Sequence, residues 1–318
     1  MIRDRSKLTT ERRNAASRDI DRRSTLAIVD LINAEDRRVA PAVRRQRRKI
    51  AAAVEMVAAA LAGGGRLFYV GAGTSGRLGV LDASECPPTF GTRPRQVQGI
   101  IAGGRRALVR SVEGAEDRAA DGAAAINRYR VGRRDVVVGI AACGLTPFVR
   151  AAIGRARRRG AGTVFLTCAP QVAREVEADV TIVPVVGPEV VTGSTRMKAG
   201  TATKMVLNTL TTAAMIRAGK VYGNLMVDLR ATNAKLRDRA RRIVQTVTGL
   251  GPPAALRLLV RAGGEVKPAI VMHARDASLA EARRILKESG GILREALSNR
   301  AAPSHRAAGL LSRRARSG

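Results

Sequence analysis

The residues Leu67-Phe68-Tyr69-Val70 run directly into Gly71-Ala72-Gly73-Thr74-Ser75-Gly76-Arg77, and this stretch decides the fold of the chain. Four strand-forming residues meet a loop that contains three glycines and two hydroxyls, and a helix-compatible run follows at 78–84. A strand that turns through glycines into a helix start presents backbone N–H groups and the positive end of a helix dipole to an anion. The stretch therefore predicts a phosphate site, to which Thr74 and Ser75 add hydroxyl donors.

The same loop contains Gly71-x-Gly73-x-x-Gly76, which is the spacing of dinucleotide-binding loops. That fingerprint also needs an acidic residue about 20 positions later, at the end of the second strand. The candidate second strand at 97–101 leads instead to Arg105 and Arg106, which would suit a 2′-phosphate. NADP therefore stays an alternative, although the hydroxyl-rich loop suits a phosphate monoester better.

Short apolar runs alternate with helix-compatible stretches through the middle of the chain. We predict strands at 67–70, 97–101, 135–140, 163–167 and 180–183, and helices at about 77–86, 105–112, 116–127 and 147–158. This alternation is typical of an α/β fold, a doubly wound parallel sheet covered by helices on both faces. Ligands of such sheets bind beyond the carboxyl ends of the strands, so the loops after 70, 140 and 183 are expected to converge.

Helices are predicted on both sides of the sheet region. Ser24 and Thr25 open a helix that Asn33–Asp36 closes, and a single long helix is expected over 39–62. Further helices are predicted at about 196–218 and then at 229–247, 253–262, 277–288 and 290–298. We divide the chain into an N-terminal arm and helices (1–62), a sheet domain (63–228), a small C-terminal helical domain (229–298) and a basic tail expected to be disordered (299–318).

The chain is strongly basic, with 57 Lys and Arg against 26 Asp and Glu and a net charge of +31. Such a balance raises nucleic acid as a partner. The arginine clusters at 44–48, 157–159 and 239–242 lie in different predicted helices, and aromatic residues make up only 2% of the chain. Specific nucleic-acid binding is therefore not expected, whereas weak, salt-sensitive binding to polyanions is.

Other features favour a cytoplasmic protein without a metal site. No apolar run approaches the roughly 18 residues that span a membrane, and no apolar segment follows the charged N-terminus as in a signal peptide. The cysteines Cys86, Cys143 and Cys168 are scattered and do not have metal-ligand spacing.

Two further loops are candidates for the same site. Ala141–Pro147 is a second strand-to-helix turn, with Gly144 for the bend and Thr146 as a hydroxyl donor. The third loop, 187–198, places Ser194 and Thr195 directly before a long helix.

Four segments, taken together, resemble the N-acetylmuramic acid 6-phosphate etherases, and the likeness extends from Thr10 to about residue 298. The segments are Gly71–Arg77, Leu81-Asp82-Ala83-Ser84-Glu85-Cys86-Pro87-Pro88-Thr89-Phe90, Val112–Asp117 and Gly193–Thr201. The resemblance implies a sugar isomerase (SIS) domain, a homodimer, and a role in amino-sugar catabolism and cell-wall recycling. It also implies a carbon–oxygen lyase that yields N-acetylglucosamine 6-phosphate and D-lactate with no metal or redox cofactor.

The chemistry that the resemblance implies needs two acid–base groups. The proton at C2 of the open-chain aldehyde is removed, lactate leaves from C3 with help from an acid, and water adds to the conjugated aldehyde. The family's two catalytic glutamates fall on Glu85 and Glu116. Glu85 would protonate the departing lactate and Glu116 would act at C2 and then on water; the reverse division of these two roles stays open.

The resemblance also places the phosphate and shows one departure. The phosphate falls on Thr74, Ser75 and Gly76 of the first loop and on Ser194 and Thr195 of the third. The family's second loop reads Ser-Gly-Arg-Thr-Pro, whereas this chain has Cys143-Gly144-Leu145-Thr146-Pro147. A thiol is a weaker donor than a hydroxyl, and leucine removes a charge, so substrate binding at this loop is expected to be weaker.

Two other functions remain open at this stage. A non-catalytic sugar-phosphate-binding regulator would keep the phosphate loops without turnover, and an aldose–ketose isomerase would share proton abstraction at C2. Release of D-lactate from N-acetylmuramic acid 6-phosphate distinguishes the etherase from both.

Overall fold

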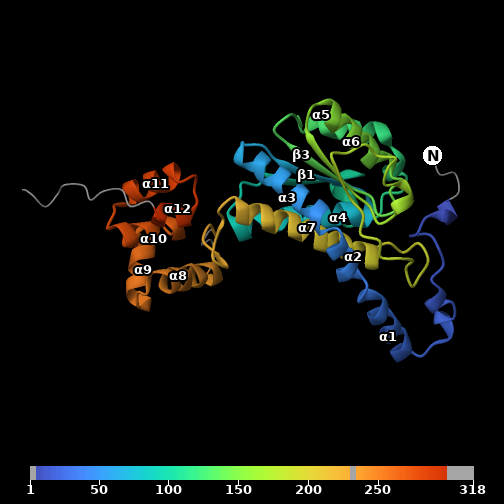
Figure 1. The fold of residues 1–318 in the computed structure, drawn as a ribbon, viewed down its shortest axis with the longest axis horizontal. Coiled ribbons are helices and arrows are strands. Elements are labelled where there is room, and N and C mark those ends of the chain that lie inside the picture. Colours follow the sequence, from blue (N-terminus) through green and yellow to red (C-terminus); the bar gives the residue numbers. More distant parts are fainter. Residues whose placement is uncertain (1–4, 230–233, 299–318) are drawn as a thin grey trace, which may run out of the picture. The chain divides into compact units, whose positions relative to one another are not determined.

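A computed structural model describes residues 5–229 and 234–298 of the chain (Figure 1). The chain divides into two compact units, Met1–Arg230 and Ala231–Gly318. The first unit joins the N-terminal helices to the sheet, and our finer division at residue 62 stays a prediction. The expected basic tail at 299–318 lies outside the described residues.

Five parallel strands form the sheet of the first unit, in the order β2-β1-β3-β4-β5. Their bounds are Leu67–Gly71 (β1), Val97–Ile101 (β2), Val136–Ile140 (β3), Gly162–Leu166 (β4) and Val180–Ile182 (β5). Leu67 pairs with both Val97 and Val136, so β1, β2 and β3 end at the same edge. The doubly wound parallel sheet is confirmed, because strands that are buried on both faces read as continuous apolar runs.

Helices cover both faces of this sheet (Figure 1). Leu67 and Tyr69 face a core shared with α3 (Arg47–Ala62), α4 (Gly73–Phe90) and α7 (Lys198–Arg217). Phe68 and Val70 face the opposite core, which is shared with α5 (Ala119–Arg128) and α6 (Pro147–Arg158). Successive side chains of a strand point to opposite faces, so one apolar run supplies two cores.

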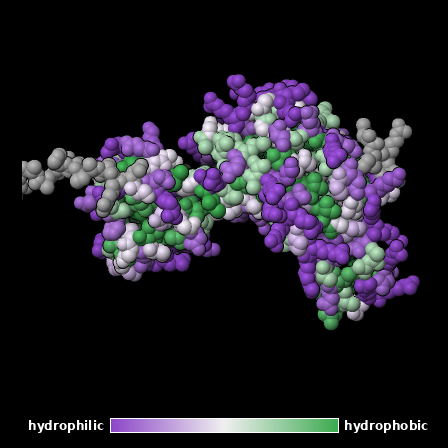
Figure 2. Space-filling model, viewed as in Figure 1, coloured by the Kyte–Doolittle hydropathy of each residue, from purple (hydrophilic) through white to green (hydrophobic). Residues whose placement is uncertain are grey.

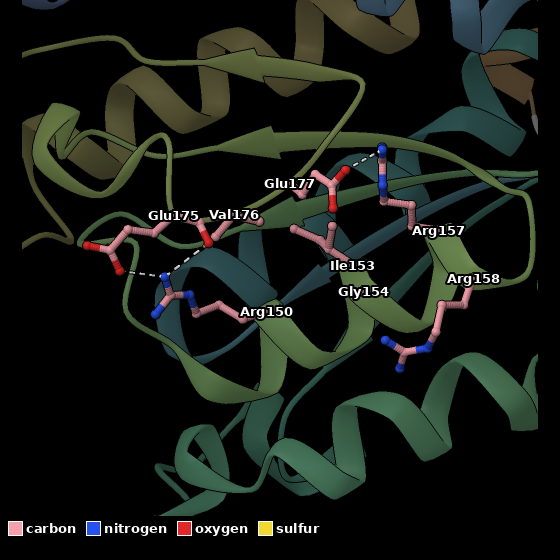
Figure 3. A pocket seen from close by; sticks show the side chains of 8 residues that line it. All are labelled: Arg150, Ile153, Gly154, Arg157, Arg158, Glu175, Val176 and Glu177. Atoms are coloured by element: carbon pink, nitrogen blue, oxygen red, sulfur yellow. Dashed lines mark hydrogen bonds and ion pairs between the residues drawn. The ribbon is translucent and has the colours of Figure 1, made fainter. Parts of the chain in front are cut away.

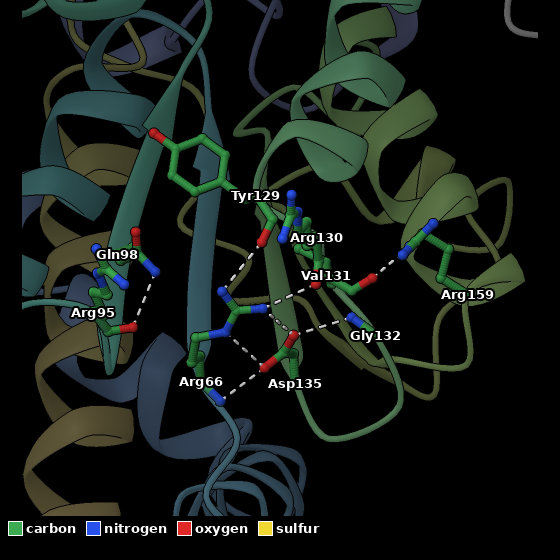
Figure 4. Close-up of polar contacts among 9 residues, drawn as sticks. All are labelled: Arg66, Arg95, Gln98, Tyr129, Arg130, Val131, Gly132, Asp135 and Arg159. Carbon is green, nitrogen blue, oxygen red and sulfur yellow. Dashed lines mark hydrogen bonds and ion pairs between the residues drawn. The ribbon is translucent and has the colours of Figure 1, made fainter.

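An ion-pair network joins the amino ends of β1 and β3 (Figure 4). The Arg66 guanidinium donates to the two carboxylate oxygens of Asp135 at 2.7 and 3.1 Å, and to the carbonyls of Tyr129 and Arg130 at 3.1 and 3.0 Å. Asp135 also accepts the N–H of Gly132 at 3.0 Å. Because ligands of such sheets bind at the carboxyl ends of the strands, we assign this bidentate pair a structural role.

The N-terminal helices differ from the prediction at two points. α1 (Thr25–Asp36) continues through the residues expected to close it, with Ser24 as its N-cap. The single helix predicted at 39–62 is wrong, because α2 (Val39–Arg45) and α3 are separated at Gln46. The Gln46 side chain accepts the backbone N–H of Val183 at 3.1 Å, so a contact beyond the end of β5 coincides with the break.

Three other helical stretches were predicted with the wrong extent. α4 is longer than the expected 77–86 and continues through Pro87 and Pro88 to Gly91, whose left-handed backbone (φ 63°) ends it. The helix predicted at 105–112 is a 3-10 turn over Gly104–Leu108. The stretch at 116–127 is a 3-10 turn, Ala115–Asp117, followed by α5.

The N-terminal arm is docked on the sheet domain. Residues 5–22 form three 3-10 turns (η1 Arg5–Lys7, η2 Ala15–Ser17 and η3 Ile20–Arg22). Leu8 is fully buried with Ala169 and Val172, and Leu145 packs against this cluster. Leu145 of the second loop thus supplies apolar contact for the arm.

The first unit ends, after α7, in two short paired strands, and the second unit is helical. The strands are β6 (Val221–Tyr222) and β7 (Leu225–Met226), and the helices are α8 (Ala234–Thr248), α9 (Pro252–Arg261), α10 (Val266–Arg275), α11 (Leu279–Glu288) and α12 (Leu293–Ser298). The sequence analysis missed α10, which is buried at every position from Val266 to Met272 and so lacks the polar face that reveals a helix. Among the described helices none alone is long and apolar enough to span a membrane, and only α8 with α9, bent by 108°, meets that test when joined.

Candidate active site

The N-terminus of α4 offers unpaired backbone donors at the carboxyl end of β1. Ala72 stands at the N-cap without a side-chain hydrogen bond, and Gly76 is the first residue whose N–H reaches a helical acceptor, the carbonyl of Ala72 at 3.2 Å. A Cβ at Gly76 would lie 2.8 Å from the Gly71 carbonyl oxygen and 2.6 Å from the Ile101 side chain, so this close approach requires glycine. These amides and the helix dipole make the first loop suitable for an anion.

The second loop leads from β3 into α6 and lies close to the first. Gly144 has φ +77°, and a Cβ there would come within 2.1 Å of the Val172 side chain. Thr146 is buried at the N-cap of α6, and Cys143 is half-buried. Burial raises the pKa of the Cys143 thiol, with the carboxylates of Glu11 and Glu116 acting in the same direction. At neutral pH the thiol is therefore protonated and is not a nucleophile.

Glu116 is exposed where two hollows meet. One, of about 220 Å³, is bounded by the first loop through Gly73 and Arg77 and by the segment 111–116. The other, of about 90 Å³, is bounded by Cys143 and Thr146 of the second loop. Glu116 therefore stands between the predicted phosphate loop and the second loop, at the point where the strand order of the sheet reverses and ligands of doubly wound sheets bind.

The third loop reaches the first through α7. A Cβ at Gly200 would lie 3.5 Å from the Thr195 carbonyl oxygen and 3.7 Å from the Thr74 methyl group. Ser194 and Thr195 are half-buried in this loop. The structure thus brings the first and third loops together, as the convergence of loops predicts.

The N-terminus of α7 is already capped by a carboxylate. Glu189, which is buried, accepts the N–H groups of Lys198 and Ala199 at 3.1 and 2.9 Å. Burial raises the pKa of Glu189 in spite of these two bonds. The third loop therefore offers its hydroxyls to a ligand, whereas α4 offers the amides of a helix start.

The Lys198 side chain extends past Gly187, at the start of the third loop, toward α1. Its ammonium is buried in an ion pair with Glu35 of α1, and Asn14 of the arm donates to the same carboxylate at 2.9 Å. Burial opposes ionisation of Glu35, but Lys198, Asn14 and Arg38 outweigh it and lower the pKa of this carboxyl. This lysine holds the start of α7 against the arm and α1.

Glu11 is a site residue that the sequence analysis did not assign. It bounds the smaller hollow with Glu116, and its carboxylate oxygen lies 3.1 Å from the Cβ position of Gly193. The only signal for it was its place at the start of the family likeness, because its position depends on how the arm docks.

Glu85 lies toward the opposite end of α4 from the predicted phosphate loop. It is exposed on α4, twelve residues beyond Gly73, or about 18 Å along the helix axis. One turn before it, buried Asp82 accepts hydrogen bonds from Tyr69 of β1 and Asn208 of α7 at 2.9 and 2.8 Å, which fixes this part of the helix. The assignment of Glu85 to the site therefore stays a prediction.

A hollow of about 380 Å³ lies elsewhere, between α6 and the segment before β5 (Figure 3). Arg150 pairs with Glu175 at 2.7 Å, and Arg157 pairs with Glu177 at 2.6 Å. Its lining contains none of the predicted site residues among those described. Among the residues that the structure describes, no cluster of three His, Cys, Asp or Glu side chains has the geometry of a metal site.

A family model and solved structures are similar to parts of this chain. The model of the glucokinase regulatory protein N-terminal SIS domain matches residues 49–157. A solved protein of Escherichia coli CFT073 is 15% identical, with a TM-score of 0.45 over 64% of this chain and 97% of that one. The Vibrio vulnificus NanR protein complexed with ManNAc-6P is 15% identical, with a TM-score of 0.40 over 70% of this chain and 71% of that one.

The parallel sheet, its flanking helices and the matched segment define a protein of the SIS-domain class. Curated relatives show to which family within this class the chain belongs. N-acetylmuramic acid 6-phosphate etherases of Klebsiella aerogenes and Synechocystis are 54% and 52% identical, over 93% of this chain and 99% and 97% of their own lengths. That of Salinibacter ruber is 55% identical over 91% of this chain and 94% of its own. The chain belongs to the N-acetylmuramic acid 6-phosphate etherase family.

Proposed function

We propose that this chain cleaves the D-lactyl ether of N-acetylmuramic acid 6-phosphate and releases N-acetylglucosamine 6-phosphate and D-lactate. It acts as a carbon–oxygen lyase in amino-sugar catabolism and cell-wall recycling. The observation that carries the proposal is the position of Glu116, a carboxylate beside the phosphate loop at the carboxyl edge of the sheet. The family membership given above supports it.

The phosphate anchors the substrate in this proposal. Thr74, Ser75 and Gly76 at the start of α4 donate to its oxygens, and Ser194 and Thr195 add hydroxyls from the third loop. A dianion at a helix N-terminus gains from the free amides and from the dipole. Cys143, Gly144 and Thr146 lie on the opposite side of Glu116 and contact the sugar or its phosphate.

The reaction then proceeds by elimination and addition. Glu116 removes the proton at C2 of the open-chain aldehyde, the C3–O bond breaks, and a second carboxylic acid gives its proton to the departing lactate. Glu116 releases this proton to solvent, from which the second carboxylate regains one. Glu116 then takes a proton from the water that adds at C3 of the conjugated aldehyde and returns it to C2. Each step is a proton transfer by a positioned carboxyl group.

Glu85 is the candidate for the second acid. Glu85 lies about 18 Å along α4 from Gly73, which is farther than a sugar phosphate extends. We therefore propose that the protein is a homodimer and that Glu85 of one copy serves the site that contains Glu116 of the other.

A mixing experiment tests the function and this shared site together. Glu85→Gln and Glu116→Gln are each expected to abolish D-lactate release from N-acetylmuramic acid 6-phosphate while leaving the circular dichroism spectrum unchanged. When the two variants are dissociated and reassociated in equal amounts, each mixed dimer holds one intact site, so activity should return to about a quarter of the wild-type value. Glu295→Gln is the matched control, since Glu295 is exposed on α12 of the second unit, and this variant should remain active.

Each result of this experiment tests one part of the proposal. Normal turnover by Glu116→Gln would refute the proposed base, and two inactive variants that stay inactive when mixed would refute the shared site. Wild-type protein that binds the sugar phosphate without releasing D-lactate would establish the alternative, a sugar-phosphate-binding regulator. A cytoplasmic location remains our prediction for the enzyme.

A further inference from the structure

α1 presents an apolar face that no other helix or strand covers extensively in the described part of the chain. Leu26 is 71% exposed and Val29 is 47% exposed, and Asp30 is exposed beside them. The spacing i, i+3, i+4 places these three residues on one face of the helix. α1 projects from the sheet domain in Figure 1, and Figure 2 shows apolar residues at the surface of this projection.

The charge of α1 is opposite to that of the chain. Its twelve residues include Asp30, Glu35 and Asp36 and no basic residue, whereas the whole chain carries +31. Glu35 is buried with Lys198, so Asp30 and Asp36 are the acids exposed to solvent. An acidic helix with apolar side chains on its surface requires a basic, apolar partner.

A groove between α3 and α7 of the same unit has these properties. Its volume is about 450 Å³, and its apolar residues are Val43, Ile50, Ala51, Val54, Ala213 and Ile216. Glu55, the one acidic residue of this lining, pairs with Arg217 at 3.4 Å. Arg44 and Arg47 stand at its edge, and neither forms an ion pair with an acidic residue in the described part of the chain. From Thr209 to Arg217 the groove extends about 12 Å along α7, which matches the roughly 10 Å from Leu26 to Asn33 of α1.

The helix cannot occupy the groove of its own chain. Only Arg37 and Arg38 separate α1 from α2, and α2 leads directly into the groove at Val43. The buried Lys198–Glu35 pair and the bond from Asn14 hold the end of α1 against the start of α7. Folding back would break a buried ion pair, which costs about 3–5 kcal/mol in other proteins.

We infer that α1 of one copy packs in the α3–α7 groove of a second copy, with Leu26 and Val29 on the apolar floor and Asp30 beside Arg44 and Arg47. Two copies related by a twofold axis fill both grooves with both helices and leave neither unpartnered, so assembly stops at the dimer. This inference rests on the homodimer proposed above and assigns it a surface.

Sedimentation equilibrium of the full chain tests this surface. Leu26→Asp on the helix and Ile216→Asp in the groove are each expected to weaken dimerisation by about tenfold or more, because each places a charge in an apolar contact. Val260→Asp is the matched control, since Val260 is 70% exposed on α9 and should leave the dimer unchanged. Equal effects of all three variants, or a wild-type chain that is monomeric, would overturn the inference.

A charge exchange tests the pairing itself. Asp30→Arg should weaken the dimer through repulsion by Arg44 and Arg47, and Arg44→Asp with Arg47→Asp in the same chain should restore it. Absence of rescue would overturn the pairing. D-lactate release is assayed separately from dimerisation. A wild-type dimer that releases no D-lactate would contradict the proposed function alone. An active protein whose dimerisation is unchanged by these variants would contradict the proposed surface alone.

Discussion

Cys143 shows how one residue differs from its family without losing its place in the fold. The loop keeps Gly144, whose left-handed backbone and contact with Val172 exclude a side chain, and it keeps Thr146 at the start of α6. The thiol replaces a hydroxyl beside Glu116, and burial raises its pKa. Leu145 packs with the buried Leu8 instead of offering a charge. The loop therefore keeps its backbone geometry but offers fewer polar groups to a ligand.

Restoring the hydroxyl at this position is expected to improve substrate binding. Cys143→Ser should lower KM by about two- to tenfold with little change in kcat, since a hydrogen bond contributes about 0.5–1.5 kcal/mol. Steady-state D-lactate release measures both constants. Cys143→Ala is the matched control and should not lower KM. A serine variant with the wild-type KM would show that this loop does not contact the substrate.

At the scale of elements, the buried pair between Lys198 and Glu35 joins α7 to α1. α7 begins at Lys198, and only Arg196 and Met197 separate it from Thr195, so we expect the position of its first turn to affect the two predicted phosphate ligands Ser194 and Thr195. Glu189 fixes the same turn through two backbone N–H groups. The arm, α1 and the third loop thus form one support for the site, although they lie far apart in the sequence.

The stability contributed by this pair should depend on pH. The folded-state pKa of Glu35 lies below its usual value of about 4.5, so its stabilisation is complete above that value and is lost as pH falls through the folded pKa. Glu35→Gln leaves Lys198 unpaired and should cost about 3–5 kcal/mol at pH 7. In urea titrations the gap to wild type should narrow as pH falls below about 4.5.

A double variant provides the control for this pair. Glu35→Gln with Lys198→Met removes both charges and should be more stable than Glu35→Gln alone, because no unpaired charge stays buried. KM should rise in Glu35→Gln if the pair positions the third loop. A gap that is constant from pH 7 to pH 3 would show that ionisation of Glu35 does not contribute.

At the scale of the whole molecule, the excess of arginine is spread over separate surfaces. Arg157 of α6 pairs with Glu177 and Asp179 at 2.6 and 3.0 Å. Arg241 and Arg242 of α8 pair with Asp238 at 2.7 and 2.9 Å. These pairs reduce the local field of the clusters at 157–159 and 239–242, and the described residues provide no aromatic platform for bases beside them. We therefore assign the charge no sequence-specific partner.

Binding to DNA should accordingly be weak and independent of sequence. Fluorescence anisotropy with two unrelated duplexes should give equal affinities, and both should fall by about tenfold or more between roughly 50 and 200 mM salt, because binding releases condensed counterions. An affinity that differs clearly between the duplexes, or that persists at high salt, would revive the nucleic-acid alternative.

The sequence by itself determined the parallel sheet, the glycine loop after β1 and the family. Each strand of the five-stranded sheet was predicted to within one residue at either end, because buried parallel strands are short apolar runs that local pattern reveals. The phosphate loops were identified for the same reason, since glycines and hydroxyls at strand ends are local features. The helix break at Gln46 and the buried α10 could not be predicted, because contacts distant in sequence decide them.

Only the tertiary structure decided which candidate residues meet. It placed Glu11 beside Glu116 because the arm docks through Leu8, and it turned Lys198 inward because Glu35 lies beneath the start of α7. It also separated Glu85 from the phosphate loop, since a rigid helix advances about 1.5 Å per residue and Asp82 fixes α4 to its neighbours. Sequence motifs identify the residue types that a reaction needs, whereas tertiary packing decides which of those residues lie close together in one chain.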